Sequence, residues 1–319
     1  MVHALEMRAG RNRFESFEMG RLAPIRDHHL LRTIANFPPD WRDNDSKRSF
    51  WLAVSVVRYF FGQEWVDEHI SPEKTTTGFL RVPLGEGADT QLSALKLVDF
   101  AELLLNLQDI PGFDNCIDRM QHGVIESTFA ELDLGRMLYS GNVDFRFVEP
   151  QQKKGLDYDI EITLSDGLVV CADAECKVEA TDFSVDSVRR SLEKARTQFL
   201  KDRPSIIFMK VPHRWFEEPI HSVSLNSIAE TFLRGTGRIV SVKFYVSHIG
   251  YRDKALRHDH AFKDISNPNN RFDSSRDWNM FAEPTAKGGW NGMPPRWKRL
   301  LFFPNDGPTR SLPSPFRAR

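Results

Sequence analysis

The chain has 319 residues, of which 40% are hydrophobic and 27% charged, so it is long enough to bury a sizeable core. Its 43 Lys and Arg residues are balanced by 44 Asp and Glu, which excludes the overall positive field that drives non-specific binding to nucleic acids. The three cysteines lack metal-type spacing and favour a reducing, cytoplasmic location. We expect no membrane partner, because the most apolar run, Phe50–Phe61, is too short to span a bilayer.

The first elements along the chain are predicted to be helices. Residues 1–40 are polar, Arg-rich and weakly periodic, which indicates a surface segment that is partly mobile. Helices are expected over Asp45–Phe61 and Thr90–Gln108, with a loop and one short strand between them over residues 72–89. Residues 41–121 are therefore predicted to form a helical region. Such a region either binds a substrate or partner or simply adds mass to the core.

A helix followed by strands comes next. The predicted elements, in order, are a helix that contains Glu131–Leu138 and ends at Gly141, strands at 143–148, 155–162 and 168–177, a helix at 187–199 and a strand at 205–211. The sequence Ser165-Asp166-Gly167 predicts a hairpin turn between the second and third strands. This order predicts an α/β fold.

Charged side chains line the two strands of this hairpin. Alternation along the first strand gives one face to Asp157, Asp159 and Glu161, opposite Tyr158, Ile160 and Ile162. Alternation along the second gives one face to Asp173, Glu175 and Lys177, with Cys171 in the same parity and buried. Carboxylate oxygens are the ligands that Mg²⁺ prefers, and an ammonium group two residues away can orient or deprotonate water.

The alternative is an exposed hairpin with a solvated, charged face, which explains Asp159 and Glu161 well. It explains Asp173, Glu175 and Lys177 less well, because they follow Leu168-Val169-Val170 in a strand that is predicted to be buried. Buried charges are costly unless they are paired or bound to a metal.

These residues resemble the PD-(D/E)xK, or restriction-endonuclease-like, nuclease superfamily. Asp157 matches the Asp of the signature and Glu175-Cys176-Lys177 match (D/E)xK, while Leu156 stands where proline usually precedes the Asp. The order of elements over about residues 123–248 is similar too. The resemblance implies a restriction-endonuclease-like core, with a mixed central sheet flanked by helices, over residues 122–250.

The resemblance also implies a metal-dependent nuclease that hydrolyses phosphodiester bonds. Its implied ligands for Mg²⁺ or Mn²⁺ are Asp157, Glu175, the backbone carbonyl of Cys176 and, directly or through water, Glu131. Lys177 would position the attacking water, and Lys194 and Gln198 would hold a phosphate or steady Lys177. The implied activity is that of an endo- or exodeoxyribonuclease, with DNA favoured over RNA and a homodimer possible. The alternative is a nuclease-fold protein that has lost cleavage and serves as a binding or scaffold protein.

Two electrostatic expectations follow from this site. Carboxylates that converge without a metal ion repel one another, so at least one of Glu131, Asp157 and Glu175 should have a raised pKa. The same carboxylates should keep Lys177 charged.

The C-terminal part is predicted to be less regular. Ile239–Val246 is expected to be a strand at the edge of the sheet, and residues 251–319 an irregular arm on the core. Its aromatic residues are Trp278, Phe281, Trp290, Trp297, Phe302 and Phe303. Beside Arg296, Lys298 and Arg299 they could stack on bases, or they could serve as hydrophobic anchors. His258 and His260 are either a metal pair on a strand or part of a solvated loop.

Overall fold

The structure is a computed structural model, and it describes residues 22–70, 88–151, 153, 155–179, 181–252, 255–272, 276, 278 and 297–300. Side chains at 88–91 and 248–259 are outside that description. Within it, no helix is both long and apolar enough to cross a membrane. The predicted loop and short strand at 72–89 lie almost wholly outside the described residues, as do residues 1–21.

The fold is α/β, with a mixed open sheet of six strands in the order β1-β2-β3-β4-β5-β6. The strands are β1 (Asp144–Phe147), β2 (Ile160–Thr163), β3 (Val169–Cys176), β4 (Ser205–Lys210), β5 (Ile239–Arg252) and β6 (Ala255–Ser266). Pairing is antiparallel from β1 to β3, parallel from β3 to β5 and antiparallel again between β5 and β6.

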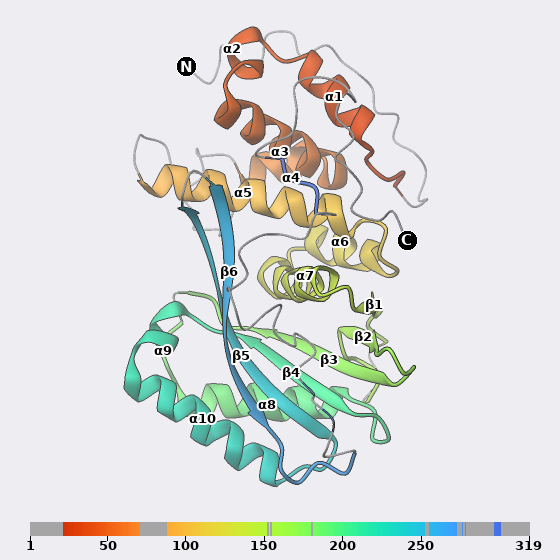
Figure 1. The fold of residues 1–319 in the computed structure, drawn as a ribbon, viewed down its shortest axis with the longest axis vertical. Helices are drawn as coiled ribbons and strands as arrows, with labels where there is room; N and C mark the ends of the chain where they lie inside the picture. The colour runs from red at the N-terminus through yellow and green to blue at the C-terminus, as the bar shows by residue number, and fades with distance from the viewer. Residues whose placement is uncertain are drawn as a thin grey trace, which may run out of the picture.

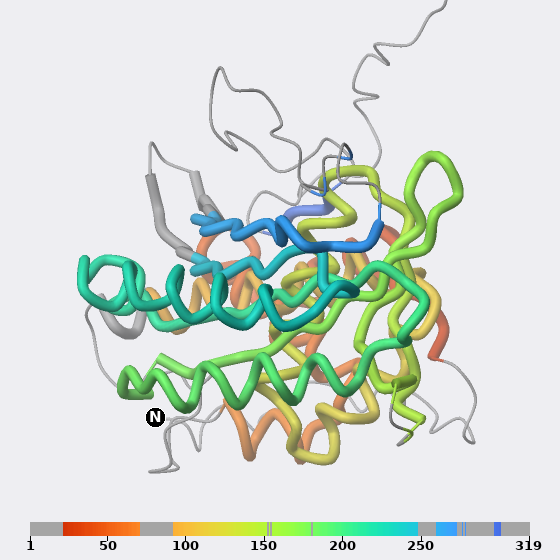
Figure 2. Tube along the Cα trace, turned by 90° about the horizontal axis from the view of Figure 1, so that it is seen from below, coloured from red at the N-terminus to blue at the C-terminus, as the bar shows by residue number. Residues whose placement is uncertain are grey.

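Helices cover both faces of this sheet (Figure 1). The described helices are α1 (Asp27–Ala35), α2 (Pro39–Arg42), α3 (Asp45–Phe61), α4 (Gln63–His69), α5 (Ala88–Leu107), α6 (Phe113–Gln121), α7 (Ile125–Ser140), α8 (Val185–Gln198), α9 (His213–Glu217) and α10 (Pro219–Arg234). In Figure 1, α8 and α10 lie below the sheet, α7 lies directly above it, and α1 to α5 stack above α7. Seen from below, α8 and α10 run side by side (Figure 2).

Each face of the sheet has its own hydrophobic core. The upper core joins sheet residues such as Ile160 and Phe208 to the buried residues of α3, α5, α6 and α7. The lower core joins Cys171, Ile207 and Met209 to α8, α9 and α10. The expected helical region of residues 41–121 therefore packs into the same core as the upper face of the sheet.

The predicted order of helix, strand, hairpin, helix and strand is confirmed by α7, β1, β2, β3, α8 and β4. Helix α7 ends with Gly141 as its C-cap, as expected. Helix α8 begins at Ser184, whose hydroxyl accepts a hydrogen bond from the Ser187 N–H, the usual role of serine at an N-cap. The turn between β2 and β3 has Gly167 at φ 83°, a conformation that glycine adopts without strain. Cys171 is fully buried, also as expected.

The strand predicted at 155–162 is wrong over its first half, because β2 begins only at Ile160. The backbone of Gly155 and Asp157 bonds to the last turn of α8 instead of to β3: the N–H of Gly155 donates to Thr197 O, and that of Asp157 to Gln198 O. The predicted faces are wrong as well, since Tyr158 belongs to the lower core while Ile160 belongs to the upper one.

Two expectations for the C-terminal part are also wrong. Strand β5 is not at the edge of the sheet, because it pairs with β4 on one side and β6 on the other. Residues 255–266 are not irregular, since they form β6 and pair with residues 241–252 of β5. The sequence offers few signals here, because His, Asp, Arg and Lys interrupt the alternation of β6.

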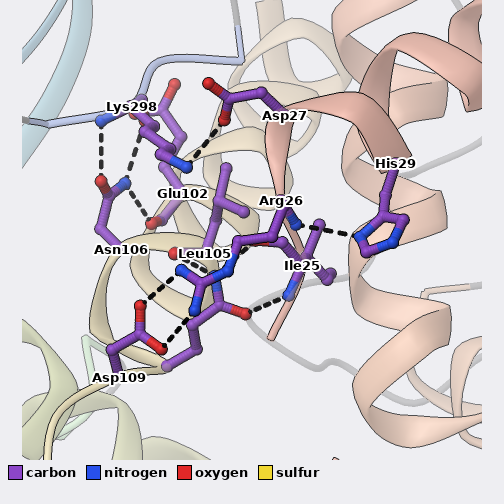
Figure 3. Close-up of polar contacts among 10 residues, drawn as sticks. Ile25, Arg26, Asp27, His29, Glu102, Leu105, Asn106, Asp109 and Lys298 are labelled. Carbon is purple, nitrogen blue, oxygen red and sulfur yellow. Dashed lines mark hydrogen bonds and ion pairs between the residues drawn. The ribbon is translucent and has the colours of Figure 1, made fainter. Parts of the chain in front are cut away.

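Segments from near both ends of the chain meet on α5 (Figure 3). Glu102 accepts hydrogen bonds from the Trp297 indole N–H and the Leu300 backbone N–H. Asn106 exchanges side-chain hydrogen bonds with the backbone of Lys298, whose ammonium lies 2.7 Å from Asp27 Oδ1. Because Trp297 is buried and its N–H is bonded, its predicted role as an anchor is confirmed. Trp278 is buried too, and the other four aromatic residues of the arm lie outside the described residues.

Candidate active site

The candidate site lies where one edge of β3 is no longer paired with β2. Strand β2 begins at Ile160, opposite Ala172, so residues 173–176 of β3 extend past it. The Ala172 carbonyl points toward β2, because it accepts a hydrogen bond from the Asp159 N–H. Backbone alternation along a strand therefore directs the carbonyl of Cys176 to the same edge. Side chains from both faces of the sheet can meet at such an edge.

Asp159 lies at the start of this open edge. Its carboxylate Oδ2 accepts a hydrogen bond of 2.7 Å from the Ala174 N–H, so the side chain replaces the strand partner that β3 lacks there. Burial raises the pKa of Asp159 to about 6, although the Ala174 N–H and Arg119 act in the opposite direction. Nearby Glu175 raises this pKa further.

Asp173 and Glu175 come from β3 on the face that α8 covers, in register with Ile207 and Met209 of the lower core. Asp173 is 2% exposed, and its pKa is raised well above the usual range by burial and by the neighbouring charges of Asp159 and Glu175. Glu175 Oε1 lies 3.4 Å from the Lys194 ammonium, and this carboxylate raises the pKa of Lys194.

Glu131 reaches the cluster from α7, on the other face of the sheet. It is 4% exposed and forms an ion pair with Arg119 of α6. Its pKa is raised well above the usual range, first by burial and then by the charge of Asp159. The expectation of raised carboxylate pKa values is therefore confirmed for Glu131, one of the three residues it named.

Lys177 follows β3 and points to α8. Its ammonium donates to Ser191 Oγ at 2.7 Å and to Ser187 Oγ at 3.2 Å. Burial lowers the pKa of Lys177, while the charge of Glu175 acts in the opposite direction, as expected of a neighbouring carboxylate. Its hydrogen-bond partners are neutral hydroxyls, and Glu175 forms its ion pair with Lys194.

Asp157 and Gln198 hold each other at the end of α8, on one side of the site. The Asp157 N–H donates to Gln198 O, and the Gln198 amide donates back to Asp157 O at 3.2 Å. The carboxylates that raise the pKa of Asp173 are Asp159, Glu175 and Glu131, and Glu175 also raises that of Asp159. Asp157 is not among the largest contributors to either pKa. The structure thus brings Asp159, rather than Asp157, beside Glu175.

Sequence reasoning missed Asp159 and Asp173 as site residues. The signal for Asp159 is its position directly before Ile160-Glu161-Ile162, where the strand alternation begins. The signal for Asp173 is its place inside an apolar strand, where a carboxylate needs a partner. Arg119 had no such signal, since only the tertiary fold brings α6 to Glu131.

These residues fit a hard divalent cation by their chemistry. The side chains at the edge of β3 supply carboxylate oxygens, which suit Mg²⁺ or Mn²⁺. Asp173 Oδ2 is buried and has no hydrogen-bond partner among the described residues. As these side chains lie, no three of the described Asp, Glu, His or Cys residues are grouped closely enough to hold a metal ion. Binding therefore requires the carboxylates to move together around the ion.

A second buried group of charges lies on the other side of α7. His260 Nε2 is 3.2 Å from Asp133 Oδ1, and Lys210 Nζ is 3.7 Å from Asp133 Oδ2. The solvated loop expected at His258 and His260 is wrong, since both are on β6 and the His260 side chain is 5% exposed. Arg136 joins this group to α5 through Asp99, at 2.5 and 2.7 Å.

Comparison with known proteins finds no family model that matches this chain and no curated protein similar to it.

Proposed function

We propose that this protein is a metal-dependent nuclease with a restriction-endonuclease-like core, and that it hydrolyses phosphodiester bonds in DNA. The observation that carries the proposal is the position of Asp159 at the open edge of β3, where it binds the Ala174 N–H and interacts electrostatically with Glu131 and Glu175, with Lys194 paired to Glu175. Acidic oxygens and an ammonium group at one strand end are what metal-assisted phosphodiester hydrolysis requires.

The assignment of the core is supported by topology. An antiparallel hairpin leads into a parallel strand pair, with α7 on one face of the sheet and α8 on the other. This is the arrangement that the superfamily resemblance implies for a mixed central sheet flanked by helices. In the proposal, Asp159 takes the part of the signature Asp, because Asp159 interacts electrostatically with Glu131, Asp173 and Glu175, whereas Asp157 is not among the largest contributors to their pKa values.

Asp159, Glu175 and the Cys176 carbonyl would hold Mg²⁺ or Mn²⁺, with Glu131 completing the acidic set. The bound cation would offset the negative charge that develops on the phosphate oxygens. Lys177, held by the hydroxyls of Ser187 and Ser191, orients a water molecule toward phosphorus. In the reaction the water oxygen bonds to phosphorus and the bond from phosphorus to the leaving oxygen breaks. The attacking water loses a proton to solvent, and the leaving oxygen takes one up from solvent.

Support for a nucleic-acid substrate comes from the charge on α8 and the segment after it. The basic residues of this segment include Arg189, Arg190, Lys194 and Lys201, although the whole chain is close to neutral. Positive side chains beside an acidic site can contact the phosphates that flank the bond to be cut. DNA is preferred to RNA in the proposal because the superfamily resemblance implies it.

The test is cleavage of plasmid, single-stranded DNA and RNA with Mg²⁺, with Mn²⁺ and with chelator. Glu175→Gln, Asp159→Asn and Lys177→Met should each lower cleavage by at least about 100-fold, a loss typical of catalytic groups. The matched control is Asp144→Asn, which removes an exposed carboxylate from β1 and should leave activity unchanged.

A binding or scaffold protein that retains the fold is the competing interpretation. It predicts no cleavage of any of these substrates and no rise in melting temperature at millimolar metal. A cation that binds only the native state must raise stability by mass action, so the two measurements together separate the interpretations. Full activity in both the Glu175 and the Lys177 variants would rule out this site.

A further inference from the structure

Arg119 is a partly buried cation that has no part in the proposed mechanism. It belongs to the last turn of α6, and its guanidinium forms an ion pair with Glu131 of α7. Its side chain is 19% exposed and that of Glu131 is 5% exposed, so Arg119 is the member of the pair that solvent can reach. The charge of Arg119 also acts on Asp159, against the rise in pKa that burial causes there. Arg119 therefore offsets the negative charge of two carboxylates of the candidate site.

The ion pair with Arg119 conflicts with the part that Glu131 plays in the proposed site. No three of the described Asp, Glu, His or Cys residues are grouped closely enough to hold a metal ion, so the acidic side chains must rearrange before a cation binds. A divalent cation that takes Glu131 would come to lie beside the guanidinium. Two cations at one buried carboxylate repel each other strongly, because water screens them poorly there. Arg119 and the divalent cation therefore compete for Glu131.

Arg119 has hydrogen-bond donors that its present partners do not use. Both of its described hydrogen bonds start from one nitrogen: Nη2 donates to Glu131 Oε2 and, at 3.5 Å, to the weak acceptor Cys116 Sγ. The Nε atom is buried and has no hydrogen-bond partner among the described residues. A guanidinium presents five N–H donors in a planar fork that matches two oxygens of a phosphate group. The unused donors of Arg119 thus suit a phosphate better than they suit its present partners.

The movement that would bring Arg119 to a substrate involves its side chain alone. Helix α6 is fixed in the upper core by its buried residues, which are Phe113, Cys116, Ile117 and Met120. Loss of the ion pair with Glu131 would therefore leave the helix in place and release only the guanidinium. Since the side chain already reaches solvent beside the acidic residues, a phosphate that enters the site from solvent would meet it there.

We propose that Arg119 is a phosphate-binding residue of this site, held by Glu131 in the metal-free protein and released to the substrate when a divalent cation takes Glu131. The inference rests on the proposed function and deepens it, because it makes recognition of a DNA phosphate depend on prior binding of metal. In the metal-free protein the guanidinium offsets the charge of Glu131 and Asp159. In the loaded protein the cation does so, and the guanidinium donates two hydrogen bonds to phosphate oxygens.

The experiment measures how fast phenylglyoxal, a reagent specific for arginine, modifies Arg119 in the full wild-type chain, with mass spectrometry as the readout. Mn²⁺ without substrate should raise the rate at least about 10-fold over the rate in chelator, because a charge-assisted hydrogen bond is lost. A DNA duplex with phosphorothioate linkages, which resist cleavage, should lower the rate again when Mn²⁺ is present. The internal control is Arg32, an exposed residue of α1, whose rate should be the same in all three states.

Variants separate this role from simple positioning of Glu131. Arg119→Met should bind Mn²⁺ at least as tightly as wild type in equilibrium dialysis, because the competing cation is gone. In fluorescence anisotropy it should bind the phosphorothioate duplex about 10-fold more weakly with Mn²⁺ and equally in chelator. Arg119→Lys should restore only part of that affinity, since an ammonium lacks the fork. Arg32→Met should match wild type in every assay. If Arg119 only positioned Glu131, Arg119→Met would bind Mn²⁺ more weakly, and that result would overturn the inference.

The same measurements distinguish failure of the inference from failure of the proposed function. If Mn²⁺ binds and DNA is cut while the modification of Arg119 stays unchanged, the inference fails and the proposed nuclease stands. A rise with Mn²⁺ that the duplex does not reverse overturns the inference as well, because the released guanidinium then binds no phosphate. If Mn²⁺ does not bind and nothing is cut, both fail.

Discussion

Asp159→Asn should stabilise this protein in the absence of metal ions. The pKa of Asp159 is about 6 in the folded protein, against 3.8 for an unperturbed aspartate. The folded chain therefore binds this proton more tightly than the unfolded chain, and stability falls as the pH rises from about 4 to about 6, then stays low above that range. A rise of this size corresponds to about 3 kcal/mol. The asparagine keeps an oxygen for the Ala174 N–H but adds N–H groups that need acceptors, which offsets about 1–2 kcal/mol of the gain.

Urea unfolding with chelator, at about pH 4 and about pH 8, measures this effect. We expect the variant to exceed wild type by about 1–2 kcal/mol at the higher pH and to fall about 1 kcal/mol below it at the lower pH, where folded wild type holds the Asp159 proton and the cost of the asparagine N–H groups remains. Saturating Mg²⁺ should reverse the order, since metal at 100 times its Kd stabilises wild type by about 2.7 kcal/mol. Asp144→Asn should follow wild type throughout. A variant clearly less stable than wild type at the higher pH, with chelator, would mean that Asp159 is a structural partner of Ala174 and not a member of a repelling cluster.

Three further outcomes are expected. Arg136→Met should destabilise the protein by about 3–5 kcal/mol in urea unfolding, because it removes one side of a buried ion pair with Asp99. Replacing Asp99 as well should restore part of the loss, and simple additivity would contradict this. Burial is the main cause that raises the pKa of Glu102 to about 7, so the free energy of unfolding of wild type should fall between about pH 4.5 and pH 7. Glu102→Gln should make the free energy of unfolding depend less on pH in this range. An unchanged pH dependence would exclude Glu102 as its source. Ser191→Ala should lower kcat about 10-fold with Mn²⁺ binding unchanged, and Ser191→Thr should restore kcat. Equal kcat values in wild type and both variants would mean that the Ser191 hydroxyl does not position Lys177.

Local signals in the sequence were sufficient to predict the elements around the site. The hairpin between β2 and β3 is specified by alternation and by a glycine in a left-handed conformation, and α7 and α8 end or begin at residues that cap helices. Strand β6 could not be predicted in this way. Its register is set by β5, and its charged residues acquire partners only in the folded sheet, as His260 does with Asp133.

The choice between Asp157 and Asp159 shows why the site itself was predicted only in part. Both residues fit an alternating strand, and the sequence does not state where that strand begins. The start is fixed by a tertiary contact, in which the backbone of Gly155 and Asp157 bonds to the last carbonyls of α8. Those carbonyls lack partners within the helix, so they compete with β3 for the same N–H groups. The outcome moves the paired strand by several residues and changes which carboxylate faces Glu175.

Helix α8 carries positive side chains that a nucleic-acid substrate needs, although the chain as a whole is nearly neutral. At 100° per residue, Ser187, Ser191 and Lys194 share one side of the helix, and their contacts to Lys177 and Glu175 identify it as the side of the site. Arg190, one turn before Lys194, lies on the same side and acts on the charge of Lys177, whereas Arg189 lies on the opposite side; both are exposed. Positive charge is therefore concentrated within about a Debye length of the acidic cluster, where it can hold phosphates without a basic surface elsewhere. Binding of DNA should accordingly weaken with salt as for a few phosphate contacts, and a steep dependence would indicate a much larger interface than α8 provides.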